Sequence, residues 1–211
     1  MAGQRSAKPE IEIKLRVRNL AALVADLRRI GARSHGRVFE RNTLYDTAQA
    51  NFRERGCLLR LRTEVPAPSR LARGGARHAV ITWKAPIQRV TRSRYKQKLE
   101  QEVSITRASH WPQSLASLGL RATFRYEKYR TMYRFGALHI DLDETPVGVF
   151  LELEGDPRDI DRMAHRLGFG LRDYSRATYW DLYVSECRRL GRVARNMLFR
   201  RENSAKRPLF A

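Results

Sequence analysis

The chain has little cysteine, no long apolar run and no P-loop. Its two cysteines, Cys57 and Cys187, are too few for a disulfide framework or a cysteine metal cluster. It has no stretch of about 18 apolar residues that would indicate a membrane span, and the opening MAGQRSAKP lacks the apolar segment of a secretory signal. No G-x-x-x-x-G-K-[ST] element is present, which excludes a P-loop. We therefore expect a reduced, cytoplasmic protein that is not inserted in a membrane.

Acidic residues are also scarce relative to basic ones. The 42 lysines and arginines outnumber the 22 aspartates and glutamates, which gives a formal net charge of +20. Such a charge predicts attraction to anions, whether nucleic acid, anionic membrane or phosphorylated small molecules. Only seven of the 42 basic residues are lysine, and a bias toward arginine can reflect genome composition rather than a site. The placement of the charges along the chain is therefore more informative than their sum.

The length of 211 residues and the apolar content of 42% fit one globular domain. We expect a disordered leader at 1–8, a folded domain at 9–186, and a basic helix end and tail at 187–211. Apolar residues repeat with the helical period at 19–31, 109–118, 156–168 and 178–198. Strand-like segments occupy 10–17, 37–46, 57–64, 79–85, 95–106, 122–135, 137–143 and 148–154. The segment 65–78, rich in proline, glycine and arginine, is predicted to be a long flexible loop.

The strand-like segments carry charged residues on one face and apolar residues on the other. In the first of them, Glu10, Glu12, Lys14 and Arg16 alternate with apolar residues. Later segments repeat the pattern with polar or charged residues two or four positions apart on one face, namely Arg60 and Arg62, Thr82 and Lys84, Glu100 and Glu102, Arg130 and Arg134, Asp141 and Asp143, and Glu152 and Glu154. For any one strand, the solvated face of an antiparallel sheet is the ordinary explanation.

The whole set of strands favours a different explanation. Side chains two residues apart on a strand lie only about 7 Å apart, so paired carboxylates repel one another unless a cation lies between them. Closing about eight strands into a barrel would turn every charged face toward one lumen, wide enough for a small ligand. The apolar faces would then point outward, where amphipathic helices can cover them. We therefore predict an α+β fold: an eight-stranded antiparallel closed β-barrel, a tunnel with a charged lumen, with helices packed on the outside.

The order of the charged elements resembles the CYTH domain, or triphosphate tunnel metalloenzyme, superfamily. The opening E-x-E-x-K at 10–14 is similar to the N-terminal signature of that family. Six further elements follow in family order over roughly residues 10–183, and these are L-R-L-R at 59–62, T-x-K at 82–84, E-x-E at 100–102, K-x-R at 128–130, L-D at 142–143 and G-x-F-x-E-x-E at 148–154. The closing segment departs from the pattern, because Arg176 and Thr178 stand where many members have lysine and serine before the tyrosine.

The resemblance implies a tunnel that binds a triphosphate-bearing substrate together with Mg²⁺ or Mn²⁺. Arginine and lysine suit phosphate oxygens, and the phosphate-binding candidates are Lys14, Arg60, Arg62, Lys84, Lys128, Arg130 and Arg176, with Arg16 and Arg134 as weaker ones. Carboxylate oxygens suit a hard cation, and the candidate ligands are Glu10, Glu12, Asp143, Glu152 and Glu154. Glu102, with Glu100, would orient or deprotonate the attacking water, and Lys84 joins them as a candidate catalytic residue.

The favoured function is metal-dependent hydrolysis of inorganic tripolyphosphate or a related organic triphosphate. The main alternative is a class IV adenylyl cyclase that converts ATP to cyclic AMP, although the sequence reveals no adenine pocket. Trp83, Tyr129 and Tyr133 fall on the outer strand faces, where we expect them to pack under helices. A third alternative is binding of polyphosphate or RNA without turnover, with the basic C-terminal tail contacting nucleic acid. The chain is expected to be a monomer or a homodimer.

Overall fold

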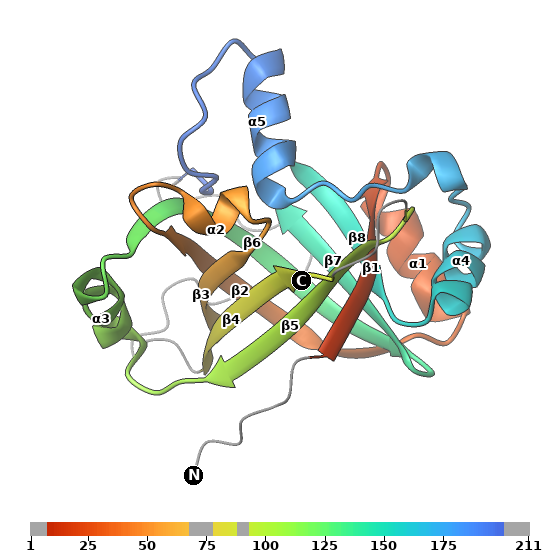
Figure 1. Ribbon diagram of the computed structural model, residues 1–211. Helices are drawn as coiled ribbons and strands as arrows, with labels where there is room; N and C mark the ends of the chain where they lie inside the picture. Colours follow the sequence, from red (N-terminus) through yellow and green to blue (C-terminus); the bar gives the residue numbers. More distant parts are fainter. Residues whose placement is uncertain (1–7, 68–77, 88–92, 201–211) are drawn as a thin grey trace.

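The computed structural model describes residues 8–67, 78–87 and 93–200. Eight antiparallel strands close a barrel in the order β1-β5-β4-β3-β2-β6-β7-β8 (Figure 1). The strands are β1 (Lys8–Val17), β2 (Arg33–Asp46), β3 (Leu58–Pro66), β4 (His78–Pro86), β5 (Lys96–Ser104), β6 (Arg121–Phe135), β7 (Leu138–Thr145) and β8 (Gly148–Glu154). The predicted eight-stranded closed barrel is therefore confirmed.

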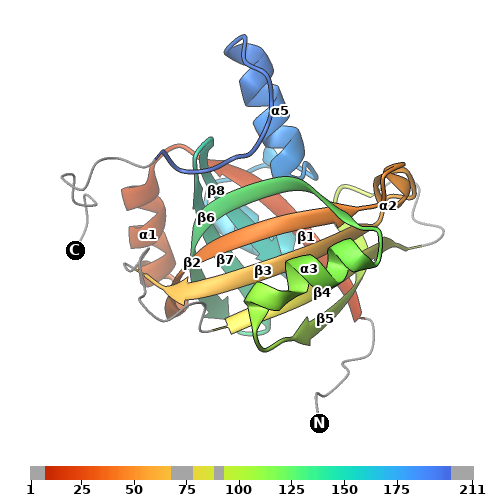
Figure 2. The ribbon, with the colours of Figure 1, turned by 90° about the vertical axis from the view of Figure 1, so that its left-hand side faces the viewer.

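Five α-helices lie outside the barrel. They are α1 (Leu20–Arg29), α2 (Asn51–Glu54), α3 (Trp111–Ser117), α4 (Pro157–Arg166) and α5 (Tyr179–Arg189). α1 and α4 lie together on one side of the barrel, whereas α3 lies on the opposite side, across the outer face near β3 and β4 (Figures 1 and 2). Among the described residues, no helix is both long enough and apolar enough to cross a bilayer.

The main apolar core lies outside the barrel wall rather than in its lumen. Leu27 of α1 and Ile160 of α4 are fully buried in one cluster with Ile13, Leu15 and Leu153 of the strands. These strand residues have odd numbers, so their charged even-numbered neighbours point the other way, into the barrel. The apolar and charged faces are therefore inverted relative to an ordinary filled barrel, as the alternation predicts.

The last helix is shorter than predicted. α5 ends at Arg189, not near residue 198, and Gly191 adopts a φ of 63°, which glycine tolerates and other residues rarely do. Residues 192–199 then return to β6 as a non-helical segment, which we call the C-terminal strap. The Met197 N–H donates to the Arg125 carbonyl at 2.9 Å, and the Glu127 N–H donates to the Met197 carbonyl at 3.0 Å. The prediction of a helix up to residue 198 was wrong, because the periodicity of the segment itself cannot show that residues 192–199 form backbone hydrogen bonds with β6, which is distant in the sequence.

Three predicted segments fall at the margins of the described chain. Lys8 already belongs to β1, and the rest of the expected leader at 1–8 lies outside the described residues. The strands extend into the predicted loop at 65–78 from both ends, up to Pro66 and from His78, while residues 68–77 are not described. The part of the tail beyond residue 200 is not described either.

Candidate functional site

The barrel encloses a cavity of about 880 Å³ whose wall is densely charged. The strand register explains the crowding, because even-numbered residues face one another across neighbouring strands. Glu12 pairs with Lys96 of β5 on one side and with Glu154 of β8 on the other. Likewise, Thr82 of β4 lies between Arg60 of β3 and Glu102 of β5. Cations and carboxylates from different strands therefore meet in one lumen.

Most of the predicted site residues line this cavity. They are Glu10, Glu12, Lys14, Arg60, Arg62, Lys84, Glu100, Glu102, Lys128, Arg130, Arg134, Glu152 and Glu154. Three predicted residues are not brought to its wall. Arg16 is exposed and lies over the Phe150 ring, while Arg176 is exposed and donates to the Ser93 carbonyl at 2.9 Å. Asp143 is fully buried beneath the wall.

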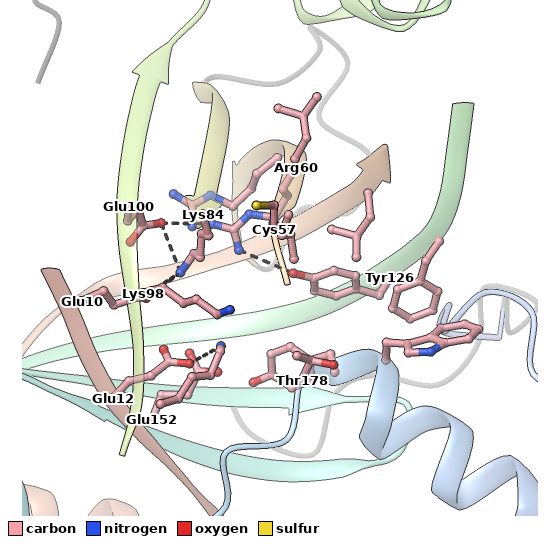
Figure 3. A pocket seen from close by; sticks show the side chains of 18 of the residues that line it. Glu10, Glu12, Cys57, Arg60, Lys84, Lys98, Glu100, Tyr126, Glu152 and Thr178 are labelled. Atoms are coloured by element: carbon pink, nitrogen blue, oxygen red, sulfur yellow. Dashed lines mark hydrogen bonds and ion pairs between the residues drawn. The ribbon is translucent and has the colours of Figure 1, made fainter. Parts of the chain in front are cut away.

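At one part of the lumen, lysines are paired with glutamates of β1. The Lys84 ammonium lies 2.6 Å from the Glu10 carboxylate and 3.2 Å from that of Glu100 (Figure 3). The Lys96 ammonium lies 2.5 Å from the Glu12 carboxylate. Burial raises the pKa of Glu12, but the charges of Lys96 and Lys14 outweigh it and lower the pKa to about 2. The Glu12 carboxylate is therefore held ionised by the neighbouring ammonium groups, whereas burial raises the pKa of Glu10 and Lys84 offsets this only in part.

A second group of charges centres on Asp143. Its carboxylate accepts hydrogen bonds from Lys128 at 2.8 Å, from the Tyr179 hydroxyl at 2.5 Å and from Arg130 at 2.6 and 2.8 Å. Arg130 also donates to Glu152, whose other partner is Lys14 at 2.8 Å. Asp143 and Glu152, both predicted as metal ligands, are therefore bound to cationic side chains in this structure.

A third group surrounds Glu102. Its Oε1 accepts a hydrogen bond from the Thr82 hydroxyl at 2.8 Å, and Arg60 and Arg62 each donate to it at 3.4 Å. Burial raises the pKa of Glu102, but Arg62, Arg60 and the Thr82 hydrogen bond together hold it below the usual value. The ionised carboxylate is thus oriented as a hydrogen-bond acceptor, which suits positioning a water molecule.

Glu154 differs from the other lumen carboxylates. In the described part of the chain, its side chain makes no hydrogen bond or ion pair. Burial, together with the neighbouring charges of Glu10 and Glu12, raises its pKa to about 7. A carboxylate that is crowded by other carboxylates and lacks a cationic partner is one that a bound cation would stabilise.

The residues around Glu154 fit a hard divalent cation in their chemistry. No group of three or more His, Cys, Asp or Glu side chains among the described residues is arranged to hold a metal by itself. Mg²⁺, however, commonly keeps several waters and is held by one or two carboxylates plus substrate phosphates. Glu154, with Glu12 opposite it on β1 and Glu10 close enough to influence its pKa, is therefore the candidate position for such a cation.

Several residues in or beneath the cavity wall were missed by the sequence analysis. Lys96 and Lys98 line the cavity, and the same alternation that marks Glu100 and Glu102 would have found them. Glu40 of β2 is 1% exposed and lies 3.5 Å from the Lys128 ammonium. Asn42 donates to Glu40 at 3.2 Å. These two also follow the alternation, but β2 carries no like-charge pair to draw attention to them.

Two of the three outer aromatic residues, Trp83 and Tyr133, pack under helices as predicted, whereas Tyr129 packs against β2 and the C-terminal strap. Trp83 contacts Phe52 of α2 edge to face, with ring centroids 5.0 Å apart. Tyr129 packs against Phe39, and Tyr133 belongs to the buried cluster under α1. The cavity has a different set of aromatic residues, formed by Phe124 and Tyr126 of β6 with Trp180 of α5. The sequence analysis did not anticipate this aromatic end, because α5 and β6 are far apart in the chain.

Solved structures with the same fold include proteins from bacteria, archaea and a plant. A proposed adenylate cyclase from Vibrio parahaemolyticus has a TM-score of 0.69 and 21% identity, covering 84% of this chain and 98% of that one. The PH1819 protein from Pyrococcus horikoshii has a TM-score of 0.68 and 20% identity, covering 84% and 99%. The proposed adenylyl cyclase HpAC1 from Hippeastrum, described as having a dominant triphosphatase activity, has a TM-score of 0.54 and 18% identity, covering 88% and 97%.

At these identities the likeness concerns the fold. No match was found among the curated proteins. The family model of the CYTH domain, in contrast, matches residues 8–166, which include all eight strands of the barrel and every lumen carboxylate described above. The closed barrel, the inward-facing charges and this match lead to one conclusion: the chain belongs to the CYTH domain family.

Proposed function

We propose that this protein hydrolyses a triphosphate inside the barrel with the help of Mg²⁺ or Mn²⁺. The observation that carries the proposal is the wall of the tunnel, where arginine and lysine side chains alternate in space with carboxylates. A surface needs no such arrangement, but a site that holds a polyanion and a cation together does. Membership of the CYTH domain family supports the same assignment.

The cationic side chains would bind the phosphates and stabilise the charge that develops on them. Arg60 and Arg62 offer planar guanidinium groups that can donate two hydrogen bonds to one phosphate. Lys84 and Lys96 would exchange their glutamate partners for phosphate oxygens, because both pairs lie at the cavity wall. Most of the catalytic effect in such reactions comes from positioning and electrostatics.

The carboxylates would serve the cation and the water. A divalent cation held by Glu10, Glu12 and Glu154 would neutralise phosphate charge and lower the pKa of a bound water. Glu102, fixed by Thr82 between Arg60 and Arg62, would accept a hydrogen bond from the attacking water and set its direction. Glu100 lies beside Lys84 and would hold this ammonium in place.

The decisive experiment is an analysis of products. The full chain is incubated with tripolyphosphate and, separately, with ATP, in Mg²⁺ or Mn²⁺, and we expect release of inorganic phosphate. Cyclic AMP as the main product from ATP would favour the cyclase alternative instead. Binding of either compound without any product would favour the non-catalytic alternative.

A matched pair of variants links the activity to the tunnel. Glu12→Gln removes a buried lumen carboxylate, and we expect it to abolish most phosphate release. Glu54→Gln makes the same chemical change on the exposed surface of α2 and should leave the rate unchanged. Equal rates for Glu12→Gln and the wild type would contradict the proposal.

A further inference from the structure

The tunnel has an aromatic end that bare polyphosphate would not use. The Arg60 guanidinium donates to the Tyr126 hydroxyl at 3.5 Å (Figure 3). The Tyr126 ring stacks on Phe124, with centroids 5.5 Å apart and planes at 22°, and Phe124 meets Trp180 edge to face at 4.9 Å. All three rings line the cavity. The three rings therefore contact one another in sequence, from the Arg60 guanidinium, a candidate phosphate-binding group, to the apolar surface of Trp180.

The size of the cavity agrees with an organic group beyond the phosphates. Pockets of about 300–1,000 Å³ are those that enclose drug-sized organic ligands, and this cavity has about 880 Å³. Leu44 and Phe124 give the aromatic end apolar walls, and the labelled carboxylates Glu10, Glu12 and Glu100 lie away from it (Figure 3). A chain of phosphates gains nothing from apolar walls, but a flat ring does.

Trp180 is held in place before any ligand arrives. Thr178 caps α5 by accepting from the Asp181 N–H at 3.2 Å, and the Asp181 carboxylate accepts from the Thr178 N–H at 2.8 Å. Beneath the rings, the fully buried Met197 of the C-terminal strap packs in the same cluster. Trp180 and the strap lie beyond residues 8–166, the part that matches the CYTH domain model. The contribution of α5 and the strap to this end therefore lies outside the matched family domain, whereas Phe124 and Tyr126 lie within it.

The charge at the aromatic end selects among flat rings. The Arg53 guanidinium lies 5.6 Å from the centre of the Trp180 ring, so a cation already occupies the neighbourhood of that ring. A positively charged heteroaromatic group would be repelled there, whereas a neutral nucleobase can stack on both tryptophan and a guanidinium plane. Asp46 and Asp181 also line this end, but their carboxylates accept hydrogen bonds from nearby backbone N–H groups.

From these contacts we infer that the aromatic end is a second subsite, which takes the base of a nucleoside triphosphate. Trp180 is its specificity-determining residue. The phosphates occupy the charged part of the lumen near Arg60, and the base lies against Phe124 and Trp180. This inference rests on the proposed function, because it needs the phosphates to bind in the lumen as described there.

Equilibrium binding to the full chain tests the subsite with two probes that resist hydrolysis. One is the β,γ-imido analogue of ATP and the other is imidotriphosphate, which has the phosphate chain but no base. Loss of one stacking contact corresponds to roughly a 5- to 100-fold increase in the dissociation constant. We expect Trp180→Ala to weaken binding of the ATP analogue by this factor and to leave imidotriphosphate unchanged.

Two further variants keep the test sharp. Trp180→Leu retains apolar packing on Phe124 and should show the same selective loss if the alanine variant does not fold. Trp111→Ala makes the same change on α3, outside the cavity wall, and should affect neither probe. Equal weakening of both probes by Trp180→Ala, or unchanged binding of the ATP analogue, would overturn the subsite. Failure of the wild type to bind either probe would instead overturn the proposed function.

Discussion

Lys128 of β6 carries an ammonium group in a place that water barely reaches. The residue is 1% exposed, and its Nζ lies 2.8 Å from Asp143, 3.5 Å from Glu40 and 4.9 Å from the centre of the Tyr179 ring. Burial lowers the pKa of such an amine, but here Asp143 and Glu40 raise it above the usual value. The ammonium stays charged because the negative charges of these two buried carboxylates stabilise it.

Lys128→Met should therefore destabilise the fold by about 3–5 kcal/mol, since it removes one of the two cations in contact with the buried carboxylates of Asp143 and Glu40 and leaves only the Arg130 guanidinium beside them. Urea denaturation followed by circular dichroism measures the change in the free energy of unfolding. Lys98→Met is the control, because the one described partner of the Lys98 ammonium is the Gly56 carbonyl. A variant as stable as the wild type would show that Lys128 has no structural role and is reserved for the ligand.

Arg60 has one guanidinium donor that is not satisfied by any described residue. The residue is 9% exposed, and its buried Nε has no hydrogen-bond partner among the described residues, whereas its terminal nitrogens donate to Tyr126, Thr82 and Glu102. An orphaned buried donor costs free energy unless something satisfies it, and a phosphate oxygen would do so. The guanidinium fork is therefore the feature that matters here, beyond its positive charge.

We expect Arg60→Lys to lower kcat/KM for tripolyphosphate about 10²-fold, even though the charge is kept, because the planar pair of donors is lost. Phosphate release under initial-rate conditions measures this effect. Arg29→Lys, on the exposed surface of α1, should have no effect. An unchanged rate for Arg60→Lys would mean that only the charge at this position contributes.

At the scale of elements, prediction succeeded where one strand carried its own signal. The alternation in β1, β3, β5 and β8 is visible within a few residues, so the barrel and most of its charged wall could be predicted. The C-terminal strap could not, because the burial of Met197 depends on β6, about 70 residues earlier in the chain. The aromatic end was missed for the same reason: Phe124 and Trp180 meet only once the barrel has closed.

The strap offers an element-scale test with adjacent residues. Met197 is fully buried among Phe124, Tyr126 and Tyr179, whereas Leu198 is 44% exposed. Met197→Ala should destabilise the fold by about 2–5 kcal/mol, because it leaves a cavity beneath the aromatic rings. Leu198→Ala should change stability by less than about 0.5 kcal/mol. Thermal or urea unfolding distinguishes the two, and equal stabilities would show that the strap does not hold the aromatic end.

For the molecule as a whole, the lumen is an enclosed set of charges that largely compensate one another. Lys84 is paired with Glu10, Lys96 with Glu12 and Lys14 with Glu152. A polyphosphate that takes these cations leaves the carboxylates without partners, and a divalent cation that takes the carboxylates leaves the ammonium groups free. Each ligand therefore displaces the side chain that competes with the other ligand: polyphosphate displaces the glutamates from the lysines, and the metal displaces the lysines from the glutamates. Their binding should therefore be reciprocally coupled.

Lys84→Met separates the two sides of this exchange. Without the ammonium 2.6 Å away, the Glu10 carboxylate loses its internal competitor, so Mn²⁺ should bind more tightly. Imidotriphosphate should bind more weakly, because it loses a cationic partner. Calorimetry with each ligand alone, at pH 8, measures both changes without complexes forming between the ligands.

Lys98→Met should leave Mn²⁺ binding unchanged, since Lys98 bonds to a carbonyl and not to a carboxylate. Weaker Mn²⁺ binding by Lys84→Met would mean that Glu10 does not hold the cation and that the exchange between lysine and metal does not occur.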